Sequence, residues 1–569
     1  MNDILWLTMR RLRRPLILMI IVYFLSVFGL LLIPGEDAAG EPFRIRFLDA
    51  AYFVAILATT IGFGEMPVTF THAQRLYAFI IVYPNVIVWL YSIGTIISLL
   101  VDPQFRAVRQ RSRFRHGAQR IGGDYFIVCG FGNTGRMVVR ALLRRGIGAV
   151  VIEREAERIQ GMELDDAFAP IPKLAGDVTD RRLLKMAGLT DGNPGCRGVI
   201  AITNEDHANL TVAITSKLLR PDLPVLARSE NPRVSANMAS FGTELTVNPY
   251  AIFAERLRLA LDSPVKYLVQ DWLISVPGTK LREPPEPPTG PWILAGMGRF
   301  GSLIGAALED AGVPCTVIDI HPERVKNRPG AILGRGTEAD TLIEAGIRDA
   351  AAIVAGTRDD VDNLSIIMTA RELNPDLFTV ARQENPDNEE LFAKSGADLV
   401  ARRSLIVARR ILAVATTPLL PVFLDYLLGQ DEDFAQRVKK RLSNALDGHS
   451  PSLWTLELSG EEAQSIRAAE RFGVDIELEH ITHNSRKPGT EKLACACLLL
   501  ERGASRTFVP RQDQRLMEGD RLLFAGRGSA RREMLFSLAE PTALLGLATG
   551  KPQPRGAIMR YLAERRRPA

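Results

Sequence analysis

A short stretch with two closely spaced glycines has the residue types needed to hold a dehydrated cation. Residues 59–65 have the sequence Thr-Thr-Ile-Gly-Phe-Gly-Glu. A monovalent cation gives up its water only to several oxygens at once, so its site needs successive backbone carbonyls that point at one axis and come from several subunits. Turning consecutive carbonyls to one side requires positive φ, which Gly62 and Gly64 adopt without a Cβ penalty. The Thr60 hydroxyl would add an oxygen at the inner end.

The same stretch resembles the Thr-Val-Gly-Tyr-Gly signature of potassium channels. The resemblance implies a potassium selectivity filter formed by Thr60, Ile61, Gly62, Phe63 and Gly64. Ile61 and Phe63 would face outward into packing, and because they replace the usual valine and tyrosine, the hydrogen bonds behind the filter would differ from those of the family. In a soluble protein Gly-Phe-Gly would more often be a turn, so the flanking sequence decides between the two interpretations.

Both flanks are apolar and long enough to cross a bilayer. Residues 16–33 and 76–101 carry no charged side chain, and about 20 apolar residues suffice for a spanning helix. Pro15 and Pro34 are expected to mark the ends of the first span. A cleavable signal peptide is disfavoured, because its apolar core is usually about 7–15 residues long. The apolar segment at 47–57 is too short to span and is predicted to be a re-entrant helix that leads into the filter.

Basic residues flank the two spans on what would be one side of the membrane. By the positive-inside rule, both termini are predicted to be cytoplasmic and the chain to be a multi-pass protein of the inner (plasma) membrane. One two-span module cannot enclose an axis, so several copies are required within the lipid bilayer. The basic residues are Arg10, Arg11, Arg13 and Arg14 before the first span and Arg106, Arg109, Arg111, Arg113 and Arg115 after the second.

A glycine-rich turn of another kind follows residue 122. An apolar strand-like run leads into Gly-Phe-Gly-Asn-Thr-Gly, and the next such run ends in an acid. The glycines permit a tight turn and close approach of backbone amides to a phosphate at a helix N-terminus, and a carboxylate at this distance suits ribose hydroxyls. The candidate nucleotide-binding residues are Gly130, Gly132, Asn133, Thr134, Gly135 and Glu153.

The whole pattern occurs a second time. Gly132 and Gly298, and likewise Glu153 and Asp319, are 166 residues apart (298 − 132; 319 − 153). A chance motif would not keep this spacing, so the unit is duplicated. Arg299 stands where the first copy has asparagine, and its positive charge favours a phosphate-rich ligand. The alternative is that the glycine turn serves packing alone. The second candidate set is Gly296, Gly298, Arg299, Phe300, Gly301 and Asp319.

The paired units resemble RCK (regulator of potassium conductance) domains, and with the pore module they resemble prokaryotic two-transmembrane potassium channels with tandem RCK domains, the GsuK type. The resemblance implies a homotetramer with an octameric RCK gating ring, K+ in the filter, and NAD or an adenine nucleotide (ADP, ATP or AMP) in the RCK clefts. It adds Asp177, as acceptor of the adenine amino group, to the candidate residues. Thr203, which recurs as Thr357 in the second copy, is also a candidate. Arg335 replaces Asp177 in the second copy and has only donors. Nucleotide is therefore expected in the first site, and the second stays open.

The expected fold class is a membrane α-helical two-span pore module with a re-entrant pore loop, two tandem α/β Rossmann-like RCK domains and a small α+β C-terminal lobe. An amphipathic segment at 248–261 is predicted to pair the RCK domains or to pack within its own. Residues 405–428 are predicted to be a buried inter-subunit helix pair rather than a third span, because arginines crowd their start and prolines interrupt them.

The predicted domains are a cytoplasmic tail (1–14), the pore module (15–101, with pore helix and filter at 47–65), a linker (102–122), the first RCK domain (123–281), a proline-rich linker (282–291), the second RCK domain (292–447), the lobe (448–540) and a tail (541–569).

Mostly alternating polar residues in the lobe could bind a divalent cation such as Ca2+ or could form a solvated strand face. The pattern favours the solvated face, so no metal ligands are assigned. The residues are Asp475, Glu477, Glu479, His480 and His483.

The predicted function is a potassium-selective channel gated by intracellular ligands, not an enzyme. The net charge of +5 against 70 basic and 65 acidic residues gives no case for a nucleic-acid partner, and five scattered cysteines fit reduced thiols in a cytosol. One alternative is a nucleotide-binding regulatory component of a potassium transporter. Another is a membrane-tethered NAD-dependent oxidoreductase, which needs a proton-transfer residue. Of the seven histidines, only His207 follows a predicted strand at a position suitable for proton transfer. Its counterpart in the second copy is Val361.

Overall fold

The computed structural model describes residues 2–36, 42–62, 69–190, 195–275, 277–281, 283, 286–326, 328–460, 464–471, 473–486 and 491–549. The chain divides into two compact units, Met1–Arg120 and Ile121–Ala569. This division falls within the linker predicted at 102–122.

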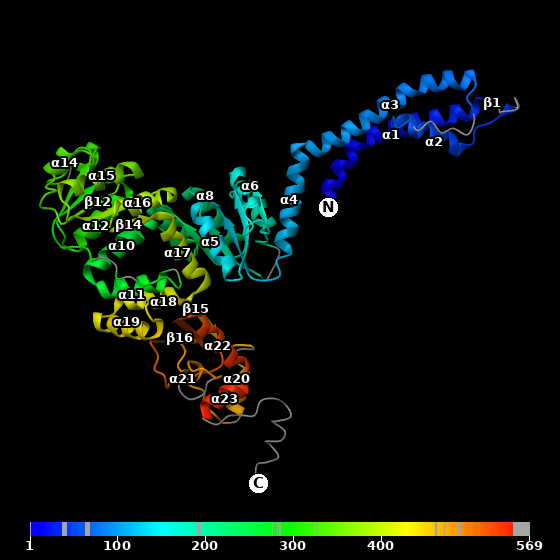
Figure 1. The fold of residues 1–569 in the computed structure, drawn as a ribbon. Helices are drawn as coiled ribbons and strands as arrows, with labels where there is room; N and C mark the ends of the chain where they lie inside the picture. The colour runs from blue at the N-terminus through cyan, green and yellow to red at the C-terminus, as the bar shows by residue number, and fades with distance from the viewer. Residues whose placement is uncertain are drawn as a thin grey trace, which may run out of the picture. The chain divides into compact units, whose positions relative to one another are not determined.

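The first unit is built around apolar helices. α1 (Asn2–Leu32) and α3 (His72–Val101) lie side by side, and the shorter α2 (Phe47–Ala58) packs against both (Figure 1). The stretches Leu12–Leu32 and His72–Leu99 are long and apolar enough to cross a membrane. Many of their large apolar side chains are exposed in the single copy, as expected for helices that face lipid or neighbouring copies. These elements match the predicted two-span module with its re-entrant helix.

Helix boundaries in this unit differ in detail from the sequence interpretation. Pro15 lies inside α1 rather than at its start, because a proline within a helix removes only its own N–H bond and strains one turn while the other bonds persist. Pro84 likewise lies inside α3. α3 begins at a capping box between Thr71 and Gln74. The basic segment after it is itself a helix, α4 (Pro103–Gln119).

Gly29 allows α1 and α3 to approach closely. The Tyr77 hydroxyl donates to the Leu25 carbonyl (2.8 Å), and a Cβ at Gly29 would lie 1.9 Å from that hydroxyl oxygen. Small residues permit such approaches between membrane helices. Gly29→Ala is therefore expected to push the Tyr77 ring aside, to break its hydrogen bond to the Leu25 carbonyl, and so to lower the melting temperature of the purified protein. Gly94→Ala, where a Cβ meets nothing within 4 Å, should leave the melting temperature unchanged, and equal shifts for both variants would contradict this packing.

The second unit contains two copies of one α/β arrangement. The sheets have the orders β5-β4-β3-β6-β7-β8 and β11-β10-β9-β12-β13-β14, with every pair of neighbours parallel. Numbered within each copy, both orders are 3-2-1-4-5-6, as in dinucleotide-binding folds. The strands are β3 (Tyr125–Cys129), β4 (Gly148–Glu153), β5 (Lys173–Ala175), β6 (Cys196–Ala201), β7 (Val225–Arg228) and β8 (Leu245–Val247), then β9 (Trp292–Ala295), β10 (Cys315–Asp319), β11 (Ile332–Leu333), β12 (Ala352–Ala355), β13 (Phe378–Gln383) and β14 (Leu399–Arg402).

Helices connect the strands and then continue beyond each sheet. The central strands are fully buried, as in parallel sheets that are covered on both faces. The connecting helices are α5 (Asn133–Arg144), α6 (Ala156–Leu164), α7 (Arg181–Met186), α8 (Asp206–Leu219) and α9 (Pro232–Ser240) in the first copy, and α12 (Arg299–Asp310), α13 (Pro322–Val325), α14 (Ala339–Glu344), α15 (Asp360–Leu373) and α16 (Glu389–Ser395) in the second; the helices that follow are α10 (Pro249–Asp262) and α11 (Pro264–Ile274), then α17 (Arg403–Thr416), α18 (Leu419–Gly429) and α19 (Glu432–Leu446).

Each copy lends a helix to the other. Tyr250 of α10 shares a hydrophobic core with Trp292 of the second sheet, and Val407 of α17 shares one with Leu142 of the first copy. Of the two alternatives for 248–261, pairing of the units is the one that the structure shows. The exchange places side chains of the second copy beside the first sheet.

The apolar segment at 405–428 forms a bent helix pair. α17 and α18 meet at 113°, and Leu420 and Phe423 of α18 are buried against α11, α19 and the sheet of the C-terminal lobe. The pair is buried as predicted, but its partners lie in the same chain, so this burial requires no second subunit.

The C-terminal lobe is a four-stranded antiparallel sheet with short helices. The strand order is β15-β18-β16-β17. Leu544 and Leu545 are buried in its core, so the lobe continues beyond the boundary predicted at 540, because the apolar face of 541–549 finds its partners in distant helices. The elements are β15 (Ser452–Glu457), α20 (Gln464–Arg471), α21 (Leu478–Ile481), β16 (Cys495–Arg502), β17 (Ser505–Phe508), β18 (Arg521–Gly526), α22 (Gly528–Ala539) and α23 (Pro541–Thr549).

Candidate functional site

The filter stretch follows directly on the C-terminal end of α2. The backbone amide of Ile61 donates to the carbonyl of Ile56 (3.2 Å), which ties the start of the loop to the helix. Gly62 has a φ of 64°, as predicted, and Thr60 has a φ of 58°. A left-handed threonine was not expected, since residues with a Cβ rarely adopt that region. Phe63 and Gly64 lie outside the described residues.

Ile61 is largely exposed among the described residues of its own copy. Its side chain is 58% exposed, whereas the interpretation of the stretch as a filter places it in a packed surround. The described part of the single chain therefore supplies the start of the backbone turn and leaves more than half of the Ile61 side chain uncovered.

The two glycine-rich turns have the same geometry. Gly130 and Gly296 have φ values of 104° and 99°, which only glycine adopts readily. A Cβ at Gly135 would lie 2.2 Å from the Gly130 carbonyl oxygen, and one at Gly301 would lie 1.9 Å from that of Gly296. The first glycine thus makes the turn, and the third lets the helix pack against it.

A cleft of about 200 Å³ opens at the carboxyl ends of the strands of the first sheet. Gly135 does not line it and instead packs under the turn. The cleft brings together the other predicted residues of the first site: Gly130, Gly132, Asn133, Thr134, Glu153, Asp177 and Thr203.

The two predicted carboxylates of this cleft are positioned by backbone amides. Glu153 is buried and accepts from the N–H groups of Phe131 (2.5 Å) and Glu155 (3.0 Å). Because an ionised carboxylate has about four acceptor positions, it can also accept from a ribose hydroxyl. Asp177 accepts from the N–H and hydroxyl of Thr179 through one oxygen, and these bonds lower the pKa of Asp177. Asp177 therefore stays ionised as an acceptor.

Sequence reasoning missed two residues that shape the cleft. Buried Asn209 accepts from the amide and hydroxyl of Thr203 (2.9 and 2.8 Å) and donates to the Arg228 carbonyl (2.9 Å), so it holds the loop after β6. Arg403 lines the cleft from α17 of the second copy. Asn209 recurs as Asn363 in the repeat, where it makes the same contacts, so the duplication could have pointed to it. The position of Arg403 depends on the helix exchange, which the sequence around Arg403 does not indicate.

Arg403 belongs to a charged network that joins the two copies. Its guanidinium lies 3.2 Å from Glu230 of the first copy and 3.0 Å from Glu384 of the second. Glu230 also pairs with Arg228 and, at 3.3 Å, with Arg299 of the second glycine turn. Burial alone would raise the pKa of Glu230, but these arginines outweigh it and hold the pKa below its ordinary value. The network thus connects the first cleft to the second turn.

The second site shares this backbone pattern but differs in its side chains. Asp319 accepts from the N–H groups of Met297 (2.6 Å) and His321 (2.9 Å), as Glu153 does in the first copy. Arg299, predicted to hold phosphate, pairs with Glu230. Phe300 is fully buried in the core, so its side chain serves packing, and its place in the cofactor site stays a prediction that concerns its backbone.

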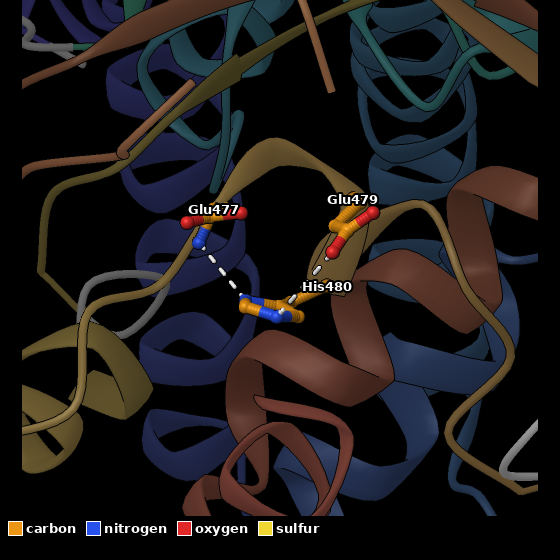
Figure 2. Close-up of side chains that lie close together, drawn as sticks. All are labelled: Glu477, Glu479 and His480. Atoms are coloured by element: carbon orange, nitrogen blue, oxygen red, sulfur yellow. Dashed lines mark hydrogen bonds and ion pairs between the residues drawn. The ribbon is translucent and has the colours of Figure 1, made fainter. Parts of the chain in front are cut away.

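The polar residues of the lobe do not form a strand face. Figure 2 shows Glu477, Glu479 and His480 grouped at α21. Their possible ligand atoms lie within 4.8 Å of one another. The Glu477 N–H donates to Nδ1 of His480 (3.0 Å), and burial lowers the pKa of His480. A neutral ring bonded in this way carries its proton on Nε2, so a metal at Nε2 would have to displace that arrangement. Calcium also prefers oxygen ligands, and Asp475 pairs with Arg515 instead.

Two family models match this chain. An ion channel model matches residues 16–102, and a TrkA-N domain model matches 126–249 and 292–402. Potassium channel protein 1 of Methanocaldococcus jannaschii is 23% identical over 45% of this chain and 73% of the relative. Voltage-gated potassium channel Kch of Escherichia coli is 26% identical over 44% of this chain and 57% of the relative. The chain belongs to the two-span potassium channels with RCK domains.

The matches divide the channel as its structure does. The ion channel match runs from residue 16, within α1, to the end of α3, and the two TrkA-N matches fall on the two sheets of the second unit. The GsuK channel has a similar fold, with a TM-score of 0.50 and 16% sequence identity over 94% of this chain and 100% of that one. The predicted fold class is confirmed.

Proposed function

We propose that four copies of this channel surround the filter of residues 60–64 in the plasma membrane and conduct K+ under the control of a nucleotide in the first cleft. The observation that carries the proposal is the convergence of the glycine turn, Glu153 and Asp177 in one cleft, on a chain whose other unit is a pore module. The termini are cytoplasmic, and the second unit contributes to a ring of eight RCK domains.

The cleft residues suit the parts of an adenine nucleotide. Asp177 accepts from the adenine amino group, Glu153 accepts from the ribose hydroxyls, and the phosphates lie at the N-terminus of α5, which favours anions. A phosphate there competes with Glu230 and Glu384 for the guanidinium of Arg403. Because that network joins the two copies, the bound and empty clefts favour different arrangements of them. A nucleotide gates the pore only if it binds the two arrangements with different affinity, and a coupling free energy of about 1–3 kcal/mol per site is typical.

Reconstitution tests the proposal directly. Full-length protein in liposomes should pass K+ far faster than Na+, and NAD, ADP, ATP or AMP on the cytoplasmic side should change the K+ flux. Calcium is tested separately, because the residues of the nucleotide cleft do not predict that calcium binds there. Equal K+ and Na+ flux would refute the filter, and selective flux that no nucleotide alters would refute the gating role.

The alternatives find less support. A hydride-transferring enzyme needs a proton-transfer residue at the cleft, and His207 is exposed and does not line it. Cys129, which precedes the turn, is buried, and burial raises the pKa of its thiol to about 12. A transporter regulator would not need the pore module that the ion channel model matches.

Arg403→Gln separates binding from gating. The variant should still bind nucleotide, because Glu153, Asp177 and the glycine turn are intact. The nucleotide effect on flux should shrink from the ~5- to 150-fold of a typical coupling to near unity, since glutamine cannot pair with both Glu230 and Glu384. Calorimetry measures the binding and liposome flux the response. Arg437→Gln, an exposed change on α19, should keep both, and a full nucleotide response in Arg403→Gln would show that this network carries no coupling.

A further inference from the structure

A second cavity lies where the helices that follow the two copies meet. Its volume is about 390 Å³, and its walls come from α10, α11, β14, α17 and α18. It shares no lining residue with the glycine-turn cleft. Its size falls within the range of about 300–1,000 Å³ that is typical of small-molecule sites.

The walls of this connector cavity combine apolar surface with positive charge. Phe253 and Leu405 are among its apolar side chains. Its four arginines are Arg256, Arg402, Arg409 and Arg410. A ligand that matches these walls has an apolar body and an anionic group.

Two of the four arginines already have partners. Arg256 donates to Asp271 (2.5 Å), and Arg402 lies 2.7 Å from Glu389. Arg409 and Arg410 make no ion pair with any residue in the described ranges. The cavity therefore retains cationic groups that its own walls do not neutralise.

The carboxylates in the walls do not offset this charge. Asp398 accepts from the N–H and hydroxyl of Thr379 (both 2.8 Å) and lies 3.4 Å from Arg371. Glu255 and Asp425 are exposed residues, so water screens their charges.

Polar atoms inside the cavity walls lack partners. Nε of Arg409 and Oε1 of Gln270 are buried with no hydrogen-bond partner. Burial lowers the pKa of Arg409; Asp271 opposes the shift, and Arg256 and Arg402 add to it. Burying such groups unpaired costs free energy, and an anion with an acceptor oxygen beside Arg409 would recover part of it.

We propose that the connector cavity binds a small organic anion, with one carboxylate, sulfonate or phosphate group paired to Arg409 and an apolar body against Phe253 and Leu405. This site is independent of nucleotide binding in the first cleft. Its walls come from segments that follow both copies, so a ligand there holds those segments together.

A matched pair of probes tests the site on the full-length protein in lipid nanodiscs. 2-Naphthoate has the required anion on an apolar body, and 2-naphthamide has the same body without the charge. Calorimetry should show naphthoate binding at least about tenfold more tightly than naphthamide, as expected for a hydrogen bond to a charged group. Excess ADP should not displace it. Equal affinity for the two probes, or displacement by ADP, would overturn the proposal.

Variants locate the binding. Arg409→Gln should weaken naphthoate at least about tenfold and leave naphthamide unchanged, and Leu405→Trp should weaken both by filling the cavity. Arg258→Gln, which removes an arginine of α10 that pairs with Asp262 outside the cavity, should change neither. Arg409→Gln should melt no lower than the parent protein, because it removes an unpaired cation. If it does not fold, Leu405→Trp takes its place, and unchanged naphthoate affinity in the variant used refutes the site.

Discussion

Gly62→Ala is expected to reduce K+ flux through reconstituted channels by more than about tenfold, since a left-handed residue with a Cβ costs roughly 1–2 kcal/mol in every copy. Gly62 has a φ of 64°, and a Cβ there meets nothing within 4 Å in the single chain. The cost is therefore one of backbone conformation rather than of a clash. To relieve this backbone strain, the alanine leaves the left-handed conformation, which turns its carbonyl away from the axis. Every copy around that axis then loses the same oxygen. Liposome flux of K+ against Na+ measures the loss.

The control for this substitution is a glycine with the same backbone conformation elsewhere. Gly146 has a φ of 75°, and a Cβ there also meets nothing within 4 Å. Gly146→Ala carries the same conformational cost of about 1–2 kcal/mol, but at the turn after α5. It should lower the melting temperature slightly and leave selectivity intact. A comparable loss of flux in both variants would attribute the Gly62 effect to general instability.

Features that depend on local pattern were predictable. The spans follow from hydropathy, and the glycine turns follow from spacing, because a left-handed turn and a close helix approach each demand glycine at one position. Gly130 and Gly135 meet these two demands in the structure. The match of Glu153 to Asp319 also holds, since both accept from two backbone amides.

Features that depend on contacts between distant segments were not predictable. Arg403 reaches the first cleft only because α17 crosses to the other copy, and nothing in its own sequence surroundings indicates that crossing. Burial of the Phe300 side chain is of the same kind, because nothing near the glycine turn indicates that α10 supplies the core around it. Thr60 adds a local exception, a left-handed backbone at a residue that has a Cβ.

Glu153→Gln is expected to weaken nucleotide binding in the first cleft by ~10- to 150-fold, because a hydrogen bond to a charged group contributes about 1.5–3 kcal/mol. The glutamine oxygen can still accept from the Phe131 N–H, so the turn keeps its main tie. Its NH2 group, however, cannot accept from the ribose and faces the N–H of Glu155 as a second donor. Calorimetry with ADP and with NAD on the purified channel measures the affinity.

Asp319→Asn makes the same chemical change in the second copy. Asp319 accepts from two backbone amides just as Glu153 does, so the structural cost of the two substitutions is matched. Only Glu153 lines the cleft that also contains Asp177. Asp319→Asn should therefore leave the affinity of the first cleft unchanged. Equal weakening in both variants would mean that turn stability, rather than contact with the ribose, sets the affinity, and the assignment of Glu153 as a nucleotide ligand would then be wrong.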